Sequence, residues 1–202
     1  MKVIGINGSA RRDGNTAILL RSVLAVLNDE GIETELIQLA GTEIAPCRAC
    51  WACGDGRGCV QRDGFAEVFE KMRFADGILL GSPVYLANVS SKMQAFLERA
   101  AVVCSMNPGL MRHKAGAAVA AVRRGGALNA VDAMNHFFLT NEMFVVGSTY
   151  WNMAYGRLPG EVEGDGEGMA NMENLGRNMA ALLKALNVQK GRRGCENGIY
   201  WR

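Results

Sequence analysis

The sequence has little net charge and no long hydrophobic run. Its 22 basic and 20 acidic residues leave a net charge of +2, too small an excess to neutralise the phosphates of a nucleic acid. The apolar run near the start, from Val3 to Ile6, ends at Asn7 and is too short for a signal-peptide core. Nothing approaches the length of a transmembrane helix. We therefore expect a cytoplasmic protein with neither a nucleic-acid nor a membrane partner.

Two nucleotide-binding motifs are also missing, and histidine is scarce. No Gly-Lys-Ser/Thr ending and no GxGxxG pattern follow the first apolar run, which disfavours a nucleoside triphosphate site and a Rossmann-bound NAD. The histidines, His113 and His136, fall beside a predicted strand and on a predicted helix, where structural roles are expected. The sequence thus predicts no catalytic acid-base residue, and it contains no internal repeat.

What is present is the composition of an ordinary globular domain. Hydrophobic residues make up 49% of the 202 residues and charged residues 21%, so a single core is expected. We predict one domain over residues 1–187, followed by a tail over residues 188–202. The tail lacks periodicity and is interpreted as an extended arm, either solvated or packed against a partner subunit through Tyr200 and Trp201.

Strand-like apolar runs alternate with amphipathic helical stretches, which is typical of an α/β fold with a parallel sheet between helices. The predicted strands cover residues 2–7, 32–39, 76–82, 115–122 and 143–147. The predicted helices cover residues 16–29, 64–74, 90–104, 127–139 and 169–187. Five such strands fit the flavodoxin-like doubly wound order 2-1-3-4-5, in which ligands bind at the carboxyl ends of strands one and three.

The loop after the first strand has the features of a phosphate site. Residues 7–16 read Asn-Gly-Ser-Ala-Arg-Arg-Asp-Gly-Asn-Thr and lead into a helix. Free backbone N–H groups and the positive end of the helix attract an anion. Ser9, Asn15 and Thr16 add side-chain donors, and Arg11 and Arg12 add charge. The alternative is a plain polar turn with a helix cap.

This loop resembles the Gly-Ser-x-Arg-x-x-Gly-Asn-Thr phosphate loop of the NADPH-dependent FMN reductase superfamily, a flavodoxin-like group. Residues 81–90, Gly-Ser-Pro-Val-Tyr-Leu-Ala-Asn-Val-Ser, are similar to the family's loop along the isoalloxazine ring. Residues 123–126, Arg-Arg-Gly-Gly, are similar to its glycine pair at the flavin edge. The resemblance covers the chain to about Leu186 and departs from the family at Ala127 and Leu128, where polar residues are common.

The resemblance implies that FMN is the cofactor. It carries the family's FMN-binding positions onto these residues: Ser9, Arg11, Arg12, Asn15, Thr16, Pro83, Val84, Tyr85, Leu86, Asn88, Arg124, Gly125 and Gly126. The residue types are compatible with those roles, because Pro83 stiffens a turn, Tyr85 offers a flat apolar face and the glycine pair permits close backbone approach. Taken singly, the second and third segments equally fit a plain turn and a flexible loop.

Four cysteines occur within a long connection after the second strand. Their spacing, Cys47-x2-Cys50-x2-Cys53-x5-Cys59, lets four thiolates converge on one inorganic centre, as iron-sulfur clusters require. We predict a [4Fe-4S] cluster, with structural zinc or free thiols as the alternatives. Cys104 is interpreted as a small buried hydrophobe, and Cys195 has no assigned role.

The cysteine motif resembles that of the iron-sulfur flavoproteins, which implies a homo-oligomer, a homodimer or homotetramer, with a [4Fe-4S] cluster near FMN. The resulting hypothesis is an oxidoreductase that takes electrons from NAD(P)H or a ferredoxin-like donor and passes them to a small-molecule or redox-protein acceptor. Two alternatives are an FMN-only NAD(P)H quinone-type reductase and a non-catalytic electron carrier.

A second long connection, residues 148–168, is rich in glycine and acids. Its carboxylates, Glu161, Glu163, Asp165 and Glu167, are interpreted as a solvated, flexible face and not as a metal site. The methionines that follow, Met169, Met172 and Met179, are interpreted as core or interface residues.

Overall fold

A parallel β-sheet forms the centre of the computed structural model, which describes residues 1–54 and 56–196, the last nine of them by backbone alone. The strands are β1 (Lys2–Asn7), β2 (Glu33–Gln38), β3 (Gly77–Pro83), β4 (Ala115–Val122), β5 (Phe144–Val145) and β6 (Met153–Tyr155). Their order is β2-β1-β3-β4-β5, and β6 also pairs with β4. The predicted doubly wound, flavodoxin-like order is confirmed.

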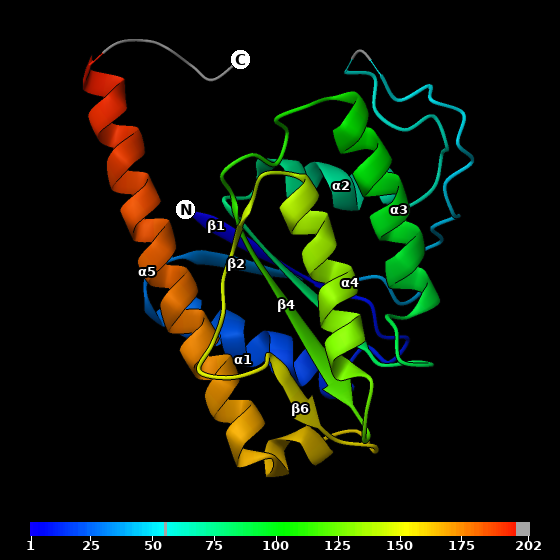
Figure 1. The fold of residues 1–202 in the computed structure, drawn as a ribbon, viewed down its shortest axis with the longest axis vertical. Coiled ribbons are helices and arrows are strands. Elements are labelled where there is room, and N and C mark those ends of the chain that lie inside the picture. Colours follow the sequence, from blue (N-terminus) through cyan, green and yellow to red (C-terminus); the bar gives the residue numbers. More distant parts are fainter. Residues whose placement is uncertain (55, 197–202) are drawn as a thin grey trace.

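Helices cover both faces of this sheet (Figure 1). They are α1 (Asn15–Asp29), α2 (Phe65–Phe74), α3 (Ser91–Met106), α4 (Ala127–Thr140) and α5 (Gly166–Glu196), with a short 3-10 helix η1 (Glu161–Gly164) before α5. Alternate strand residues point to opposite faces, so Ile4 and Ile6 pack with α2, α3 and α4, whereas Val3 packs with α1 and α5. The two faces therefore carry two separate hydrophobic clusters.

Strand β4, which lies between β3 and β5, is built mainly from small residues. All eight of its residues, Ala-Gly-Ala-Ala-Val-Ala-Ala-Val, are buried. At Gly116 a Cβ atom would lie only 2.7 Å from the Phe138 ring of α4. The small side chains therefore allow helices to approach the middle of the sheet closely from both sides.

The fifth position of the sheet differs from the prediction. A strand was expected over residues 143–147, but β5 has two residues, and β6, which was not predicted, has three. Both lie along β4: β5 pairs with Ala115 and Gly116, and β6 pairs with residues 120–122. The chain leaves the sheet between them, which makes each strand too short to show a period of two in the sequence.

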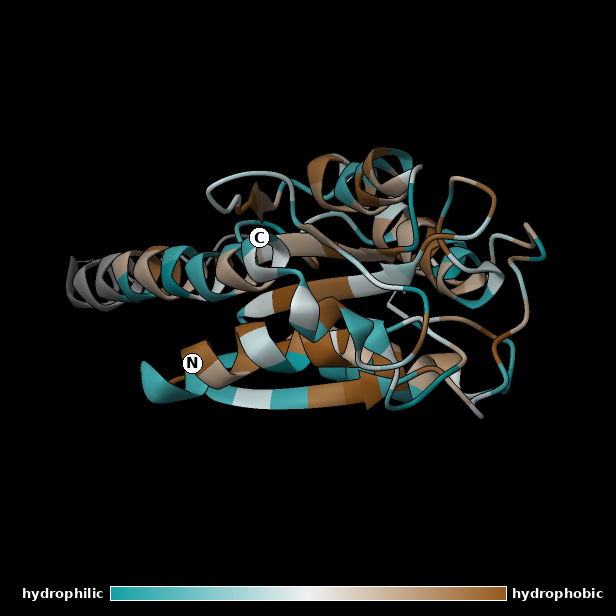
Figure 2. Cartoon of the chain, turned by 90° about the horizontal axis from the view of Figure 1, so that it is seen from below, coloured by the Kyte–Doolittle hydropathy of each residue, from teal (hydrophilic) through white to brown (hydrophobic). Residues whose placement is uncertain are grey.

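Helix α5 is longer than the predicted segment of residues 169–187. It runs to Glu196 and so includes the first part of the predicted extended tail, because no proline in residues 188–196 ends it. The coloured part of this helix carries both hydrophilic and hydrophobic residues (Figure 2). Met172 and Met179 are fully buried, which confirms their prediction as core residues. Tyr200 and Trp201 lie outside the described residues.

The acidic connection before α5 is a largely solvated face, as predicted, since Glu161, Glu163 and Glu167 are exposed, but two of its carboxylates also accept backbone hydrogen bonds. Glu161 accepts hydrogen bonds from the backbone N–H groups of Arg157 (2.6 Å) and Leu158 (2.8 Å). Asp165 accepts from the N–H groups of Tyr155 (2.8 Å) and Gly168 (3.0 Å). Carboxylates that satisfy backbone donors at turns and helix starts stabilise those turns, and the surrounding glycines do not prevent this. Across residues 1–54 and 56–196, no helix is long and apolar enough to cross a membrane.

Candidate functional site

The loop after β1 is held in its turn by the side chain of Asn7, which is fully buried. Its Nδ2 donates to Oε1 of Gln38 on β2 (2.7 Å), and its Oδ1 accepts from the backbone N–H of Ser9 (3.0 Å). The Ser9 hydroxyl accepts from the N–H of Arg11 (3.1 Å), which leaves the hydroxyl proton available to another acceptor. The polar residues thus order a loop at the point where the strand order reverses.

The amino end of α1 offers unpaired donors beside this loop. Gly14 precedes the helix without a capping side chain, and its carbonyl accepts from the N–H groups of Ala17 (2.9 Å) and Ile18 (3.2 Å). The N–H groups of Asn15 and Thr16 have no acceptor in the described part of the chain. The Thr16 hydroxyl also lacks one there, although Thr16 is only 1% exposed. Donors of this kind at a helix start fit a bound phosphate.

The side chain of Asn15 is engaged elsewhere. Its Nδ2 donates to the carbonyl of Leu158 (2.9 Å), and its Oδ1 accepts from the N–H of Gly160 (2.8 Å). Asn15 therefore fastens the segment after β6 to the start of α1. Its predicted role as a side-chain donor to phosphate stays a prediction, while its backbone N–H remains available. The side chains of Arg11, Arg12 and Arg124 are exposed, and none has an ion-pair partner within the residues described.

The loop after β3 contains a tight, strained turn. The backbones of Tyr85 and Asn88 exchange two hydrogen bonds (2.9 and 3.0 Å), and both residues between them have positive φ, 49° at Leu86 and 57° at Ala87. Glycine or asparagine usually occupies such positions, so a leucine and an alanine there store conformational strain. Leu86 is fully exposed, and Tyr85 is 52% exposed. The turn thus presents apolar side chains beside the carboxyl end of β3, where Pro83 and Val84 lead into it.

The three loops predicted to form one site meet in the structure. Ser90, which caps α3, donates from Oγ to the carbonyl of Gly8 (2.6 Å) and from its N–H to the hydroxyl of Ser82 (2.9 Å). Gly126 has φ of 84°, and a Cβ atom there would lie 2.7 Å from Cα of Ala87. The first loop is thereby joined to the second, and the second packs against the third. Gly125 has open space around it.

The four predicted ligand cysteines line a single pocket beside α3. Cys53 is buried, Cys47 and Cys59 are partly buried and Cys50 is exposed. Burial raises the pKa of the Cys53 thiol, and the nearby sulfurs of Cys59, Cys50 and Cys47 raise it further. Over the described residues, however, no three metal-binding side chains converge closely enough to hold an ion. Four thiols that line one pocket fit an iron-sulfur cluster chemically. To bind one, the loop has to bring the four sulfurs closer together.

Two side chains that the sequence analysis missed hold this cysteine loop, one from α3 and one from the residue that follows it. Asn107 donates from Nδ2 to the carbonyl of Cys53 (2.8 Å) and accepts from the N–H of Gly56 (2.8 Å). Arg99 bonds the carbonyl of Ala45 before the cysteines (3.3 Å) and, at the other end of the loop, the Cys59 sulfur (3.1 Å) and Asp63 (2.5 Å). The sequence did contain a sign that Arg99 is buried, because this charged residue lies on the apolar face of α3.

The Asp63 carboxylate ties the end of the loop to α2. It accepts from the N–H of Ala45 (2.9 Å) and, with its other oxygen, from the N–H of Phe65 (3.1 Å). Burial alone raises the pKa of Asp63, but the hydrogen bonds from Arg99 and from these two backbone groups outweigh burial and hold that pKa below its ordinary value. Cys104 lies outside the pocket, where burial raises the pKa of its thiol to about 12, consistent with an inert buried residue.

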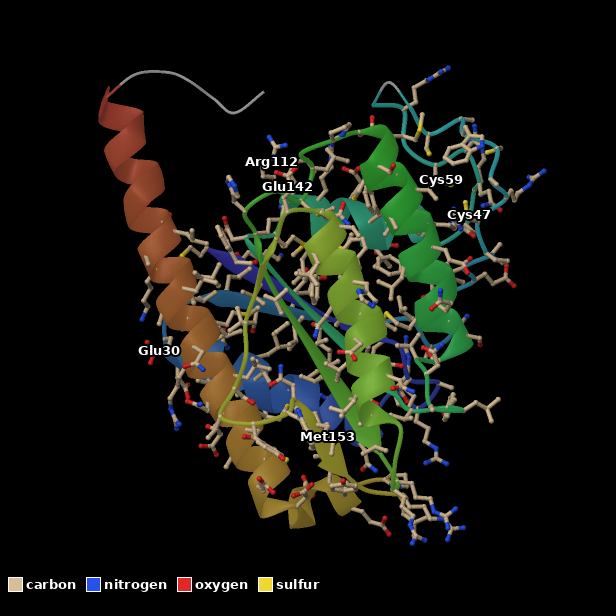
Figure 3. The ribbon with its side chains drawn as sticks, in the orientation of Figure 1. Glu30, Cys47, Cys59, Arg112, Glu142 and Met153 are labelled. Atoms are coloured by element: carbon tan, nitrogen blue, oxygen red, sulfur yellow. The ribbon has the colours of Figure 1, made fainter. Side chains whose placement is uncertain are left out.

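The cysteine pocket and the loop site occupy different ends of α3. The cap residue Ser90 contacts the loop after β1, whereas the pocket is lined by Arg99, Val102 and Val103. At about 1.5 Å per residue, nine to thirteen residues of helix separate the two sites by about 13 to 20 Å. In Figure 3, Cys47 and Cys59 lie beside the half of α3 remote from Met153, which marks the carboxyl end of β4. The cysteine loop leaves the sheet at its carboxyl edge but does not stay there.

Comparison with known proteins agrees with these features. The model of the NADPH-dependent FMN reductase family matches residues 1–157. An iron-sulfur flavoprotein of Methanocaldococcus jannaschii is 39% identical over 92% of this chain and 99% of its own length. An iron-sulfur flavoprotein of Methanosarcina thermophila is 33% identical over 95% of this chain and 99% of its own length.

Solved structures share the fold at low sequence identity. RosB with the bound intermediate 8-demethyl-8-formylriboflavin-5'-phosphate superposes with a TM-score of 0.71 at 18% identity, covering 100% of this chain and 90% of its own. A flavodoxin from the domain Archaea superposes with a TM-score of 0.60 at 15% identity, covering 91% of this chain and 99% of its own. The loop after β1, the strained turn and the glycine pair are all parts of this shared fold. The chain belongs to the NADPH-dependent FMN reductase family, in the group of the iron-sulfur flavoproteins.

Proposed function

We propose that this protein is an FMN-dependent oxidoreductase that passes electrons from NAD(P)H or a ferredoxin-like donor to a small-molecule or redox-protein acceptor. One observation carries the proposal: the loops after β1, β3 and β4 are joined into a single unit at the switch point of the sheet. Family membership and the iron-sulfur flavoproteins among its relatives support the same function.

The residues of the three loops have separate tasks in this proposal. FMN, when bound, supplies hydride and single-electron chemistry. The N–H groups of Asn15 and Thr16 and the hydroxyls of Ser9 and Thr16 hold the phosphate. The Tyr85–Asn88 turn and Gly126 border the ring system, where the glycine allows close approach of the backbone. Binding and orientation are sufficient tasks for these residues, so no acid-base side chain is assigned.

We further propose that Cys47, Cys50, Cys53 and Cys59 are the ligands of a [4Fe-4S] cluster. Their spacing, their shared pocket and the names of the relatives support this assignment. Such a cluster adds a one-electron centre to the flavin. A specific observation favours a second candidate, an FMN-only reductase in which the thiols stay free, because in the described chain the cysteines do not converge as a metal site.

Cofactor content separates these two candidates. Protein purified and reconstituted without oxygen is expected to show flavin bands with a broad visible shoulder, and about four irons and four sulfides per chain. Cys50→Ser should lose the iron and the shoulder while keeping the flavin. Cys104→Ser is the matched control, because that thiol lies outside the pocket, and it should keep both. Wild-type protein that binds FMN but takes up no iron would establish the FMN-only candidate.

Reduction kinetics test the enzymatic part of the proposal. In anaerobic stopped flow, NADPH or NADH is expected to bleach the flavin absorbance, and a reduced ferredoxin is the alternative donor to compare. A flavin that none of the three donors reduces would leave only a non-catalytic carrier. The homo-oligomeric state and the cytoplasmic location stay predictions.

A further inference from the structure

Arg99 is the largest fully buried side chain among the described residues, and it lies against the cysteine loop. Its Nη1 donates to Oδ2 of Asp63 (2.5 Å) and to the carbonyl of Ala45 (3.3 Å). Its Nη2 donates to Sγ of Cys59 (3.1 Å) and to the carbonyl of Gln61 (3.4 Å). A single guanidinium thus joins α3 to the segments immediately before and after the four cysteines.

Burying the Arg99 guanidinium costs free energy of folding, so its presence here needs an explanation other than stability. The Arg99 side chain is 1% exposed, it faces the Phe65 ring at 4.3 Å, and its Nε has no hydrogen-bond partner among the described residues. Replacing a buried ion pair by apolar residues of similar volume is often neutral or stabilising, so Arg99 and Asp63 are not needed merely to fill this space. A planar fork of donors, in contrast, is suited to hold several acceptors at once, and one of the acceptors here is a sulfur.

The Cys59 sulfur is the acceptor that connects Arg99 with chemistry. A neutral thiol is a weak acceptor, whereas a thiolate bonded to metal is negatively charged and accepts strongly. Hydrogen bonds to ligand sulfurs are among the features that set the reduction potential of iron-sulfur clusters. Partners that orient the ligands of a metal typically contribute about 10- to 100-fold to its affinity. Among the side chains lining the cysteine pocket, Arg99 is the buried cation, and Arg48 is the other basic one.

We propose that Arg99 is a positioning residue for the cluster, an inference that rests on the proposed cluster function. It fixes the Cys59 sulfur and the stems of the loop before metal binds. In the loaded protein it keeps its N–H bond to that sulfur, which favours the reduced, more negatively charged state. Asp63 keeps the guanidinium in this orientation and compensates its charge.

Two variants separate this role from a merely structural tie. Arg99→Lys keeps the charge, but a single ammonium cannot reach Cys59, Asp63 and the two carbonyls together. The double variant Arg99→Met with Asp63→Asn removes one charge of each sign, so neither charge is left buried alone. Arg112→Met is the matched control, because it breaks a two-bond ion pair with Glu142 (2.7 and 2.8 Å) outside the cysteine pocket.

Three measurements are made on anaerobically reconstituted full-length protein: FMN binding, release of iron to a chelator, and the cluster midpoint potential followed by EPR. Both Arg99 variants are expected to bind FMN as the wild type does. They should release iron about tenfold faster or more, and the clusters that remain should have a more negative potential. Arg112→Met should match the wild type in all three measurements.

The outcomes distinguish the failure of this role from the failure of the proposed function. Wild-type protein that binds no iron overturns the cluster assignment and the role of Arg99 with it. If the wild type binds the cluster but both variants have the same midpoint potential as the wild type, only the role of Arg99 is overturned. Faster iron release with an unchanged potential also overturns it, since that result describes a structural tie without influence on the sulfur.

Discussion

The hydroxyl of Thr16 provides a test of the proposed phosphate site in which the effects on stability and on FMN binding can be measured separately. Thr16 is 1% exposed, and its hydroxyl bonds nothing in the described chain, so Thr16→Val removes a polar group without removing any internal hydrogen bond. The free energy of unfolding of the protein without FMN should therefore be unchanged or slightly higher. A hydrogen bond to a charged phosphate contributes about 1.5 to 3 kcal/mol. At 1.4 kcal/mol per tenfold, FMN affinity should fall by about 10- to 150-fold.

The assay is a titration of flavin fluorescence against the protein, carried out with FMN and with riboflavin, which lacks the phosphate. Thr16→Val should weaken FMN and leave riboflavin binding unchanged. Thr140→Val is the control, because that hydroxyl bonds the carbonyl of His136 (2.9 Å) at the far end of α4. An unchanged affinity for FMN, or an equal loss for both ligands, would falsify the assignment of this hydroxyl to the phosphate.

Other predictions concern the glycine pair, the Asn15 contact and the Asp63 carboxylate. Gly126→Ala should lower both stability and FMN affinity, because its φ is 84° and the added Cβ meets Ala87. Gly125→Ala, with open space around it, should leave stability unchanged, and equal thermal melting of the two variants would contradict this. Asn15→Ala should cost about 1 kcal/mol and speed hydrogen exchange of the Gly160 amide; exchange at the wild-type rate would argue against the contact. Because the pKa of Asp63 is lowered in the folded state, its stabilisation is complete above the unfolded value of about 3.9 and is lost as pH falls through the folded pKa. Urea midpoints of wild type and Asp63→Asn should therefore converge as pH falls from 6 toward about 2, and a constant difference would refute the sign.

Much of the fold was predictable because strands in a doubly wound domain are buried on both faces and appear as short apolar runs. The bounds of β1 and β4 were predicted to the residue, and those of α1 and α2 within one residue. The prediction failed where an element is too short for a period, as in β6, and where a helix continues through a polar segment, as in α5.

The candidate site divided in a similar way. The turn after β1 and the glycine pair were recognisable, since loops after neighbouring parallel strands must meet at one edge of the sheet. The engagement of the Asn15 side chain with Leu158 was not recognisable, because the sequence contains no local sign of a partner 143 residues away. The strain at Leu86 and Ala87 could not be predicted either, since neither residue type indicates a positive φ.

Local pattern alone therefore determined the positions of most strands, the three loops that follow them and the spacing of the four cysteines, because each depends on residues close together in the chain. The order of the strands followed instead from the rules of doubly wound folds, since Val3 of β1 pairs with the distant Gly77 of β3. Tertiary packing decided where the cysteine loop lies and what holds it. Arg99 meets Asp63 and Cys59 across 36 and 40 residues, far beyond the range of any helical or strand period. Contacts of that kind arise only when α3 and the long loop pack against each other.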